Sequence, residues 1–217
     1  MRSKFDEQLL ELNSEMIKMG NMIETNITRA IEALTTKDVE LAKQIMDSDV
    51  EVDKIQTKIE SICFSLLIQQ QPVASDLRTI TAAMKMVTDM ERIGDHAADI
   101  SEMTVYLGVG ENHANFKHIN KMASETVLML NWAVEAYVEK DEEKAKKVID
   151  HDDVVDDLFC EVKKDIINLI HDNPDEGEDA TDLLMIAKYF ERIGDHATNI
   201  AEAICQSMQK SQVDNLR

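Results

Sequence analysis

The heptapeptide Glu91-Arg-Ile-Gly-Asp-His-Ala97 occurs a second time, unchanged, as Glu191-Arg-Ile-Gly-Asp-His-Ala197. The region upstream repeats as well, because residues 30–53 and 133–156 are identical at 12 of 24 aligned positions, where chance gives about one or two. Corresponding positions of the two copies are 103 residues apart in the upstream region and 100 residues apart at the heptapeptide, so the second copy lacks three residues. We place this deletion in the loop that contains Pro72 in the first copy, since loops tolerate deletions. The chain is therefore predicted to be an internal duplication.

Composition and periodicity predict that each copy is a triplet of helices. The 217 residues include only six Gly and two Pro, and aromatic residues are few. Apolar residues recur at helical spacing with few interruptions. Asp38 can cap the second helix, and Pro72 ends it before Ser75 or Asp76 can cap the third. We expect six helices, at about residues 5–34, 38–70, 75–106, 114–139, 141–170 and 179–208.

These helices predict an all-α fold made of two tandem, antiparallel three-helix bundles. The first repeat covers residues 1–107 and the second covers residues 113–217, with a Gly-containing linker at 108–112. The apolar stripes of each triplet require partners, and packing the three helices against one another supplies them. Helices of this length make the molecule elongated. The alternative is a single six-helix bundle, which the linker disfavours.

Charge and apolar content restrict the partners and the location of the chain. The net charge of −20 disfavours nucleic acid, because binding to a phosphate backbone depends on Lys and Arg. No segment approaches the ~18 apolar residues of a membrane span, and the amino terminus does not resemble a secretion signal. Cys63, Cys160 and Cys205 lack metal-site spacing and lie among apolar residues, so we expect buried free thiols in a cytoplasmic protein.

Acidic residues one helical turn apart lie beside the apolar stripe of four helices. On a helical wheel of the third helix, Glu91 and Asp95 lie at the edge of the apolar arc rather than opposite it. The same relation holds on the second, fifth and sixth helices, which carry the pairs Asp49 with Asp53, Asp152 with Asp156, and Glu191 with Asp195. Antiparallel packing would bring the two pairs of each repeat face to face.

Such pairs need a source of positive charge. Like charges at positions i and i+4 destabilise a helix, and two converging pairs do so more strongly. A cation that prefers oxygen ligands would neutralise them, and bridging carboxylates suit sites with more than one ion. The protein alternatives are Arg92 and Arg192, which lie beyond the acidic stripe on the wheel. A solvated acidic face that is paired to neighbouring Lys and Arg is the competing interpretation, and the presence of the same two acidic pairs in both copies argues against it.

Two other residues of the heptapeptide also repeat. His96 and His196 lie away from the acidic stripe, which favours a hydrogen-bonding or helix-packing role over metal ligation. Gly94 and Gly194 each cost ~1 kcal/mol inside a helix. Close approach of another helix, or room for a bound ion, would explain why both copies keep them.

The two heptapeptides, together with Gln71-Pro72-Val-Ala-Ser-Asp-Leu-Arg78, resemble the PhoU family of phosphate-transport accessory proteins. The resemblance covers nearly the whole chain. It implies a duplicated three-helix bundle that carries multinuclear metal clusters, with iron foremost and zinc, manganese or magnesium as alternatives. The ligands that it implies are the four acidic pairs, and Asp99 and Asn199 are further candidates one turn later. Because these two differ, the repeats need not bind metal identically.

The resemblance also implies a function without catalysis. Proteins of this family negatively regulate the phosphate-starvation response and link the ATPase subunit of the phosphate transporter to a sensor histidine kinase. We also expect a homodimer, although the thirteen Met fill cores as readily as interfaces. The sequence contains no common nucleophile, phosphate-loop or zinc-protease motif. The alternatives are a metal-dependent phosphate or metal-handling enzyme that uses the same carboxylates, and a metal-free helical adaptor.

Overall fold

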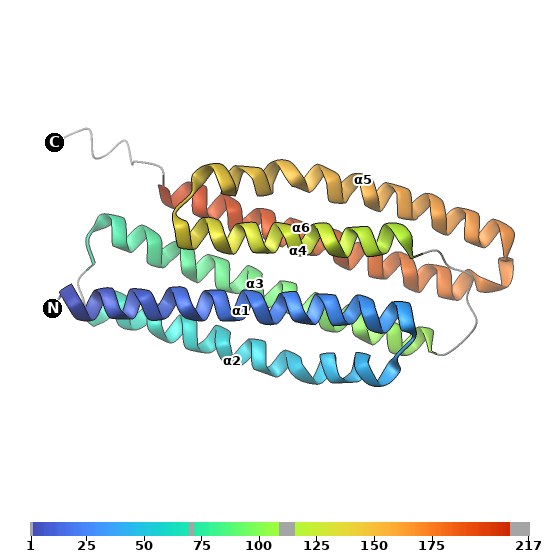
Figure 1. Ribbon diagram of the computed structural model, residues 1–217, viewed down its shortest axis with the longest axis horizontal. Helices are drawn as coiled ribbons and strands as arrows, with labels where there is room; N and C mark the ends of the chain where they lie inside the picture. Colours follow the sequence, from blue (N-terminus) through green and yellow to red (C-terminus); the bar gives the residue numbers. More distant parts are fainter. Residues whose placement is uncertain (1, 70–71, 109–115, 209–217) are drawn as a thin grey trace.

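The computed structural model describes residues 2–69, 72–108 and 116–208, and these residues form helices and no strands. Six long α-helices account for almost all of them (Figure 1). A short 3-10 helix, η1 (Pro174–Glu176), precedes the last one. The six are α1 (Arg2–Thr36), α2 (Val39–Gln69), α3 (Ala74–Leu107), α4 (Lys117–Glu139), α5 (Glu142–Asp172) and α6 (Gly177–Met208).

The helices form two antiparallel triplets, which confirms the predicted fold class. Helices α1, α2 and α3 all contact one another, and so do α4, α5 and α6. The triplets lie side by side along their lengths, and the molecule is elongated (Figure 1). They are joined through α3 with α6 and through α1 with α4. In the described residues, α2 and α5 contact only elements of their own triplet, so they flank the other four helices.

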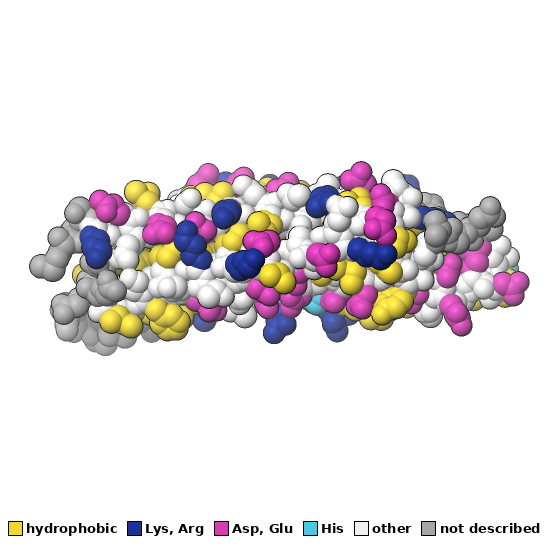
Figure 2. All heavy atoms as spheres, turned by 90° about the horizontal axis from the view of Figure 1, so that it is seen from below, with side chains coloured by type: hydrophobic (Ala, Val, Ile, Leu, Met, Phe, Trp, Pro, Cys, Tyr) yellow, Lys and Arg dark blue, Asp and Glu magenta, His cyan; other side chains and the backbone are white. Residues whose placement is uncertain are grey.

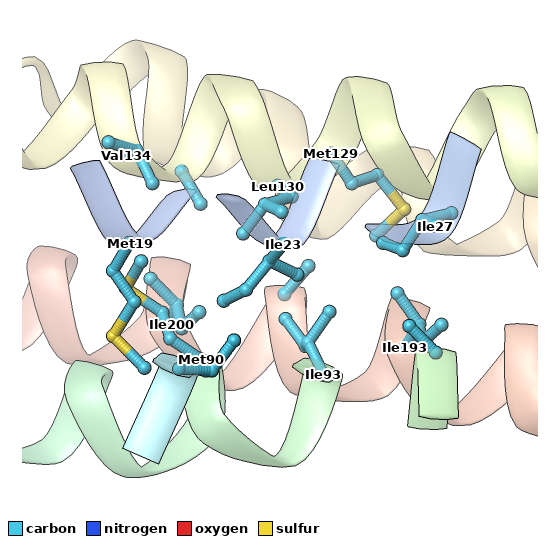
Figure 3. Packing of buried hydrophobic residues seen from close by; sticks show 14 of the residues in the cluster. Met19, Ile23, Ile27, Met90, Ile93, Met129, Leu130, Val134, Ile193 and Ile200 are labelled. Atoms are coloured by element: carbon cyan, nitrogen blue, oxygen red, sulfur yellow. The ribbon is translucent and has the colours of Figure 1, made fainter. Parts of the chain in front are cut away.

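The apolar core is continuous across both triplets. Ile23 of α1 lies beside Leu130 of α4, and Met19 of α1 and Met90 of α3 lie near Ile200 of α6 (Figure 3). All five side chains are completely buried. Burial of apolar surface is the main stabilising term in folding, so each repeat completes the core of the other. The predicted linker at 108–112 falls almost entirely outside the described residues, and the boundary there stays a prediction.

Two helix starts have side-chain caps. Asp38 Oδ1 accepts a hydrogen bond from the Leu41 amide at 2.9 Å, as predicted for the start of α2. Asp141 Oδ1 accepts one from the Lys144 amide at 3.0 Å at the start of α5. These bonds satisfy amides that have no partner within the helix.

The starts of two other helices differ from prediction. The expected caps Ser75 and Asp76 are wrong, because α3 begins at Ala74 and Val73 occupies the cap position without a side-chain hydrogen bond. Helix α6 begins at Gly177 rather than near residue 179, since η1 leads directly into it. The expected start of α4 at residue 114 lies outside the described residues.

The three cysteines do not share one environment. Cys63 is buried, and burial raises the pKa of its thiol to about 12, as befits an inert core residue. Cys205 is half-buried. The prediction of a buried thiol is wrong for Cys160, which is exposed because the flanking helix α5 keeps one face toward solvent.

The surface is rich in acidic groups. Figure 2 shows acidic side chains along the whole of one face, interleaved with Lys, Arg and exposed hydrophobic side chains. Among the described residues, no helix combines the length and the apolar character that a membrane span requires.

Candidate metal centres

The first acidic cluster lies between the flanking helix α2 and the central helix α3. Asp49 and Asp53 project from α2, one turn apart, and Asp95 projects from α3. Each places a carboxylate oxygen within 4.8 Å of the other two. Glu91 lies one turn before Asp95 and is close enough to raise the pKa of Asp49. The structure therefore brings together the two acidic pairs of the first repeat.

This first cluster lacks compensating positive charge at its buried end. Burial, reinforced by Asp95 and Asp53, raises the pKa of Asp49 to about 6. Asp49 Oδ1 is buried and has no hydrogen-bond partner. Burial and Asp95 also raise the pKa of Glu91. A buried carboxylate oxygen without a partner costs free energy that a bound cation would recover.

Gly94 allows the two helices to approach closely at this cluster. A Cβ atom at Gly94 would lie 3.1 Å from Val52 Cγ1 and 3.6 Å from Asp49 Oδ1. A side chain would therefore crowd Val52, whereas its contact with the carboxylate would be an ordinary van der Waals one. Close helix approach, one of the two explanations expected for this glycine, is confirmed.

Arg92 pairs with the acidic residues of the first cluster, although its position on the helical wheel placed it beyond them. Its guanidinium lies 3.0 Å from Asp95 Oδ2 and 3.5 Å from Glu91 Oε2. Its long side chain reaches the acidic residues that lie one position before and three positions after it on α3. Arg92 is exposed, so this pairing neutralises the outer side of the cluster and leaves Asp49 unpaired.

The second acidic cluster occupies the equivalent place between α5 and α6. Burial, with Asp195 and Asp156 next, raises the pKa of Asp152 to about 6. Burial and Glu191 raise the pKa of Asp195, and Lys188 opposes them. The four carboxylates are thus electrostatically coupled, as in the first repeat. Among the described residues, however, three acidic groups converge within 4.8 Å only in the first cluster.

The second cluster also differs in its immediate neighbours. Lys188 pairs with Glu191 from one turn earlier on α6, whereas the corresponding residue of α3 is Thr88. A Cβ atom at Gly194 would lie 3.1 Å from Asp152 Oδ1, so here the carboxylate itself fills the space above the glycine.

Asp99 and Asn199 face the α3–α6 contact, which we call the inter-repeat seam. Asp99 Oδ2 lies 3.0 Å from His96 Nδ1. Asn199 Nδ2 donates to Asp89 Oδ1 at 3.3 Å, and Asp89 Oδ1 is also 2.9 Å from His196 Nδ1. Neither Asp99 nor Asn199 joins the group of three converging carboxylates. The structure therefore gives them partners at the seam, although Asp99 still raises the pKa of Asp49.

The repeated histidines meet at the seam. The ring centroids of His96 and His196 are 5.6 Å apart, and Tyr189 lies 5.5 Å from His96. This arrangement agrees with the predicted hydrogen-bonding and packing role. Sequence reasoning missed Asp89, because its counterpart in the second copy is Tyr189 and the pattern of repeated acids does not include it.

The donor set of each cluster suits a cation. Carboxylates on two facing helices offer oxygen ligands of the kind that hard and borderline metal ions bind. The buried Asp49 oxygen without a partner and the raised pKa values of Asp49 and Asp152 indicate sites where negative charge is poorly compensated. These residues fit a metal centre.

Comparison with known proteins decides the family. The family model described as the PhoU domain matches the chain twice, at residues 16–104 and 119–204. This chain belongs to the PhoU family. The two matches coincide with the two helical triplets, which confirms the resemblance seen in the heptapeptides.

Relatives and solved structures of this PhoU chain agree over most of its length. It is 37% identical over 214 residues to the phosphate-specific transport system accessory protein PhoU homolog of Clostridium acetobutylicum, and covers 98% of both chains. The homolog of Aquifex aeolicus is 34% identical over 189 residues, covering 87% of this chain and 86% of that one. The crystal structure of PhoU from Pseudomonas aeruginosa matches with a TM-score of 0.87 at 29% identity, covering 94% of this chain and 98% of that one. These relatives are named as accessory proteins and not as enzymes.

Proposed function

We propose that this chain is a regulatory accessory protein of phosphate uptake. In this role it connects the ATPase subunit of the phosphate transporter with a sensor histidine kinase and restrains the phosphate-starvation response. The observation that carries the proposal is the family match of both repeats, together with relatives named for phosphate-specific transport. A cytoplasmic location follows from contact with these two partners.

The surface supports a role in protein contacts. Several large apolar side chains are exposed on the long helices, including Leu10 at 69% and Ile68 at 78%. Exposed apolar side chains favour contact with another protein, and two helical repeats offer two separated surfaces for two partners. A homodimer would use the same kind of surface, and sedimentation analysis of the purified chain tests it.

We further infer that both acidic clusters bind metal ions, with iron foremost and zinc, manganese or magnesium as alternatives. Asp49, Asp53, Glu91 and Asp95 would hold the first group of ions. The equivalent residues would hold the second group: Asp152, Asp156, Glu191 and Asp195. Bound cations would supply the missing positive charge and would tie each flanking helix to its central helix.

The competing function is a metal-free adaptor, which the pairing of Arg92 and Lys188 with the acidic residues favours. In that case variants of the carboxylates would change stability but not regulation. The two proposals therefore separate in the same genetic experiment.

Deletion of the gene tests the proposed function. Phosphate uptake and the expression of starvation genes should both rise in phosphate-rich medium, and the wild-type gene should restore them. A gene with Asp95→Asn and Asp195→Asn should fail to restore repression if metal is required, and should succeed if the protein is a metal-free adaptor. Unchanged uptake and expression in a strain without a second copy would contradict the regulatory role.

A further inference from the structure

A cavity whose lining combines two cations with apolar side chains, among them Leu77 and Ala203, lies between the first half of α3 and the end of α6, away from both acidic clusters. The start of α3 and the end of α6 lie next to each other at one end of the molecule (Figure 1). The cavity has a volume of about 250 Å³ and is lined by side chains from both helices. Its polar lining consists of Arg78, Thr81, Lys85, Gln206 and Ser207. No described carboxylate lines it, which is unusual in a chain with a net charge of −20.

The two cations of this cavity have no carboxylate partner among the described residues. Lys85 Nζ lies 3.5 Å from Gln206 Oε1, a long contact with a neutral group. Arg78 Nε is buried and has no hydrogen-bond partner. In contrast, Arg92 and Lys188 are paired with acidic side chains nearby. An unpaired buried guanidinium nitrogen calls for an acceptor, and an anion supplies one.

The second repeat shows that the fold does not require these cations. At the offset of 100 residues, Arg78 corresponds to Glu178 and Lys85 corresponds to Met185. The equivalent positions of the second repeat therefore carry neither cation, although they lie on the corresponding helix. The two cations therefore occur in only one of the two repeats. This is expected of residues that serve a binding site and not the shared fold.

The chemistry of the lining selects a small oxyanion. A guanidinium, an ammonium and an amide donor suit a ligand with several acceptor oxygens and more than one negative charge. Thr81 and Ser207 add hydroxyl groups. Lys85 also lines an adjoining cavity, whose Asp89 and Glu202 would repel a second phosphate group of a larger ligand. The acidic surface likewise disfavours polyanions.

We propose that this cavity binds inorganic phosphate through Arg78 and Lys85. The site is separate from the metal clusters and rests on the cations of the cavity, whereas the choice of phosphate among small oxyanions rests on the proposed function. A chain that regulates phosphate uptake would gain from it a direct way to sense its own solute.

Calorimetric titration of inorganic phosphate into the purified full-length chain tests the proposal. We expect saturable binding in a low-salt buffer, and Lys85→Met should weaken it by about tenfold or more, because an ionic hydrogen bond is lost. Lys85 is exposed, so this variant keeps the fold, which thermal unfolding checks. Lys85→Arg should retain binding. Lys43→Met, on the exposed face of α2, is the matched control and should bind as the wild type does.

Two further experiments distinguish phosphate binding in this cavity from binding at the metal clusters and from binding of a lipid phosphate. The double variant Asp49→Asn and Asp152→Asn should bind phosphate normally, and loss of binding there would place the anion on the metal clusters and overturn the proposal. Sedimentation with vesicles containing phosphatidic acid tests a lipid phosphate. If the chain bound the vesicles through Lys85 but did not bind inorganic phosphate, the proposal would be overturned. It would also be overturned if Lys85→Met and the wild type bound inorganic phosphate equally well.

Discussion

The two acidic clusters carry the same acidic residues in different electrostatic surroundings. In the first, Asp49, Asp53 and Asp95 converge within 4.8 Å, and the nearby cation Arg92 is exposed. In the second, Lys188 pairs with Glu191 and no described group of three acids converges as tightly. The acidic pairs have been retained while their neighbours diverged. The ligand pattern is therefore set by the repeated sequence, whereas the charge balance of each site is set by single residues outside it.

The largest expected effect is the loss of metal from one cluster at a time. Asp95→Asn removes a converging ligand from the first cluster, and we expect its metal affinity to fall by about 100-fold or more, since even groups that only orient ligands contribute 10- to 100-fold. Asp195→Asn is the matched variant and should affect the second cluster alone. Metal titration followed by elemental analysis measures both. Complete loss of metal from both clusters in either variant would show that the sites are not independent.

The next effect is a pH dependence of stability in the metal-free chain. The folded-state pKa of Asp49 is about 6, above its ordinary value of 3.8, so the folded state binds more protons and becomes less stable as pH rises through this window. At pH 7, Asp49→Asn should therefore stabilise the metal-free chain by about 1 kcal/mol, discounted for partial exposure. Urea unfolding with chelator at pH 4 and pH 7 measures this.

Asp152→Asn is the matched control for that experiment. The pKa of Asp152 is also raised to about 6, so the stabilisation should be similar. Destabilisation by either substitution in the metal-free chain would contradict the electrostatic interpretation of both clusters.

The glycines should respond differently to the same substitution. Alanine gains ~1 kcal/mol over glycine inside a helix, but at Gly94 its Cβ would meet Val52, a buried and stiff β-branched side chain. At Gly194 it would meet the Asp152 carboxylate, which can rotate away. We expect Gly194→Ala to be more stable than Gly94→Ala by about 0.5 to 1 kcal/mol. Chemical denaturation measures the difference, and equal stabilities would show that α2 is free to move.

The smallest effect concerns the cation of the second cluster. Lys188→Met removes the partner of Glu191, and we expect a stability loss of about 0.3 kcal/mol, typical of a helical ion pair near the surface. It should also raise the pKa of Asp195 further, which NMR titration of the side-chain carboxyl detects. Thr88→Lys, the reciprocal change in α3, serves as the comparison, and an unchanged Asp195 pKa would exclude Lys188 as the balancing charge.

The helices and the acidic pairs could be predicted from sequence because both depend on local periodicity. Apolar spacing located all six helices, and the duplication identified Asp49, Glu91 and their equivalents as candidates. The cap at Asp38 was predictable because it depends on a contact within one turn. Local sequence patterns were therefore sufficient to predict most of the fold and the acidic residues of both clusters.

Features that depend on packing between distant helices were not predictable in this way. The shared core through α1, α3, α4 and α6 depends on which apolar faces meet, and a wheel of one helix does not contain that information. Arg92 reaches the acids through its side-chain conformation, and Cys160 is exposed because α5 flanks the core. Asp89 became visible only when α3 and α6 were placed together.

The metal content of the chain tests the central claim most directly. Protein purified without chelator and without a metal-affinity tag is analysed for metals beside a variant with Asp49→Asn, Asp95→Asn, Asp152→Asn and Asp195→Asn. We predict several equivalents of metal per wild-type chain, with iron foremost, and almost none in a variant that is still folded by circular dichroism. A wild-type chain free of metal, or a variant that retains the same amount, would contradict the assignment of the acidic clusters as metal centres.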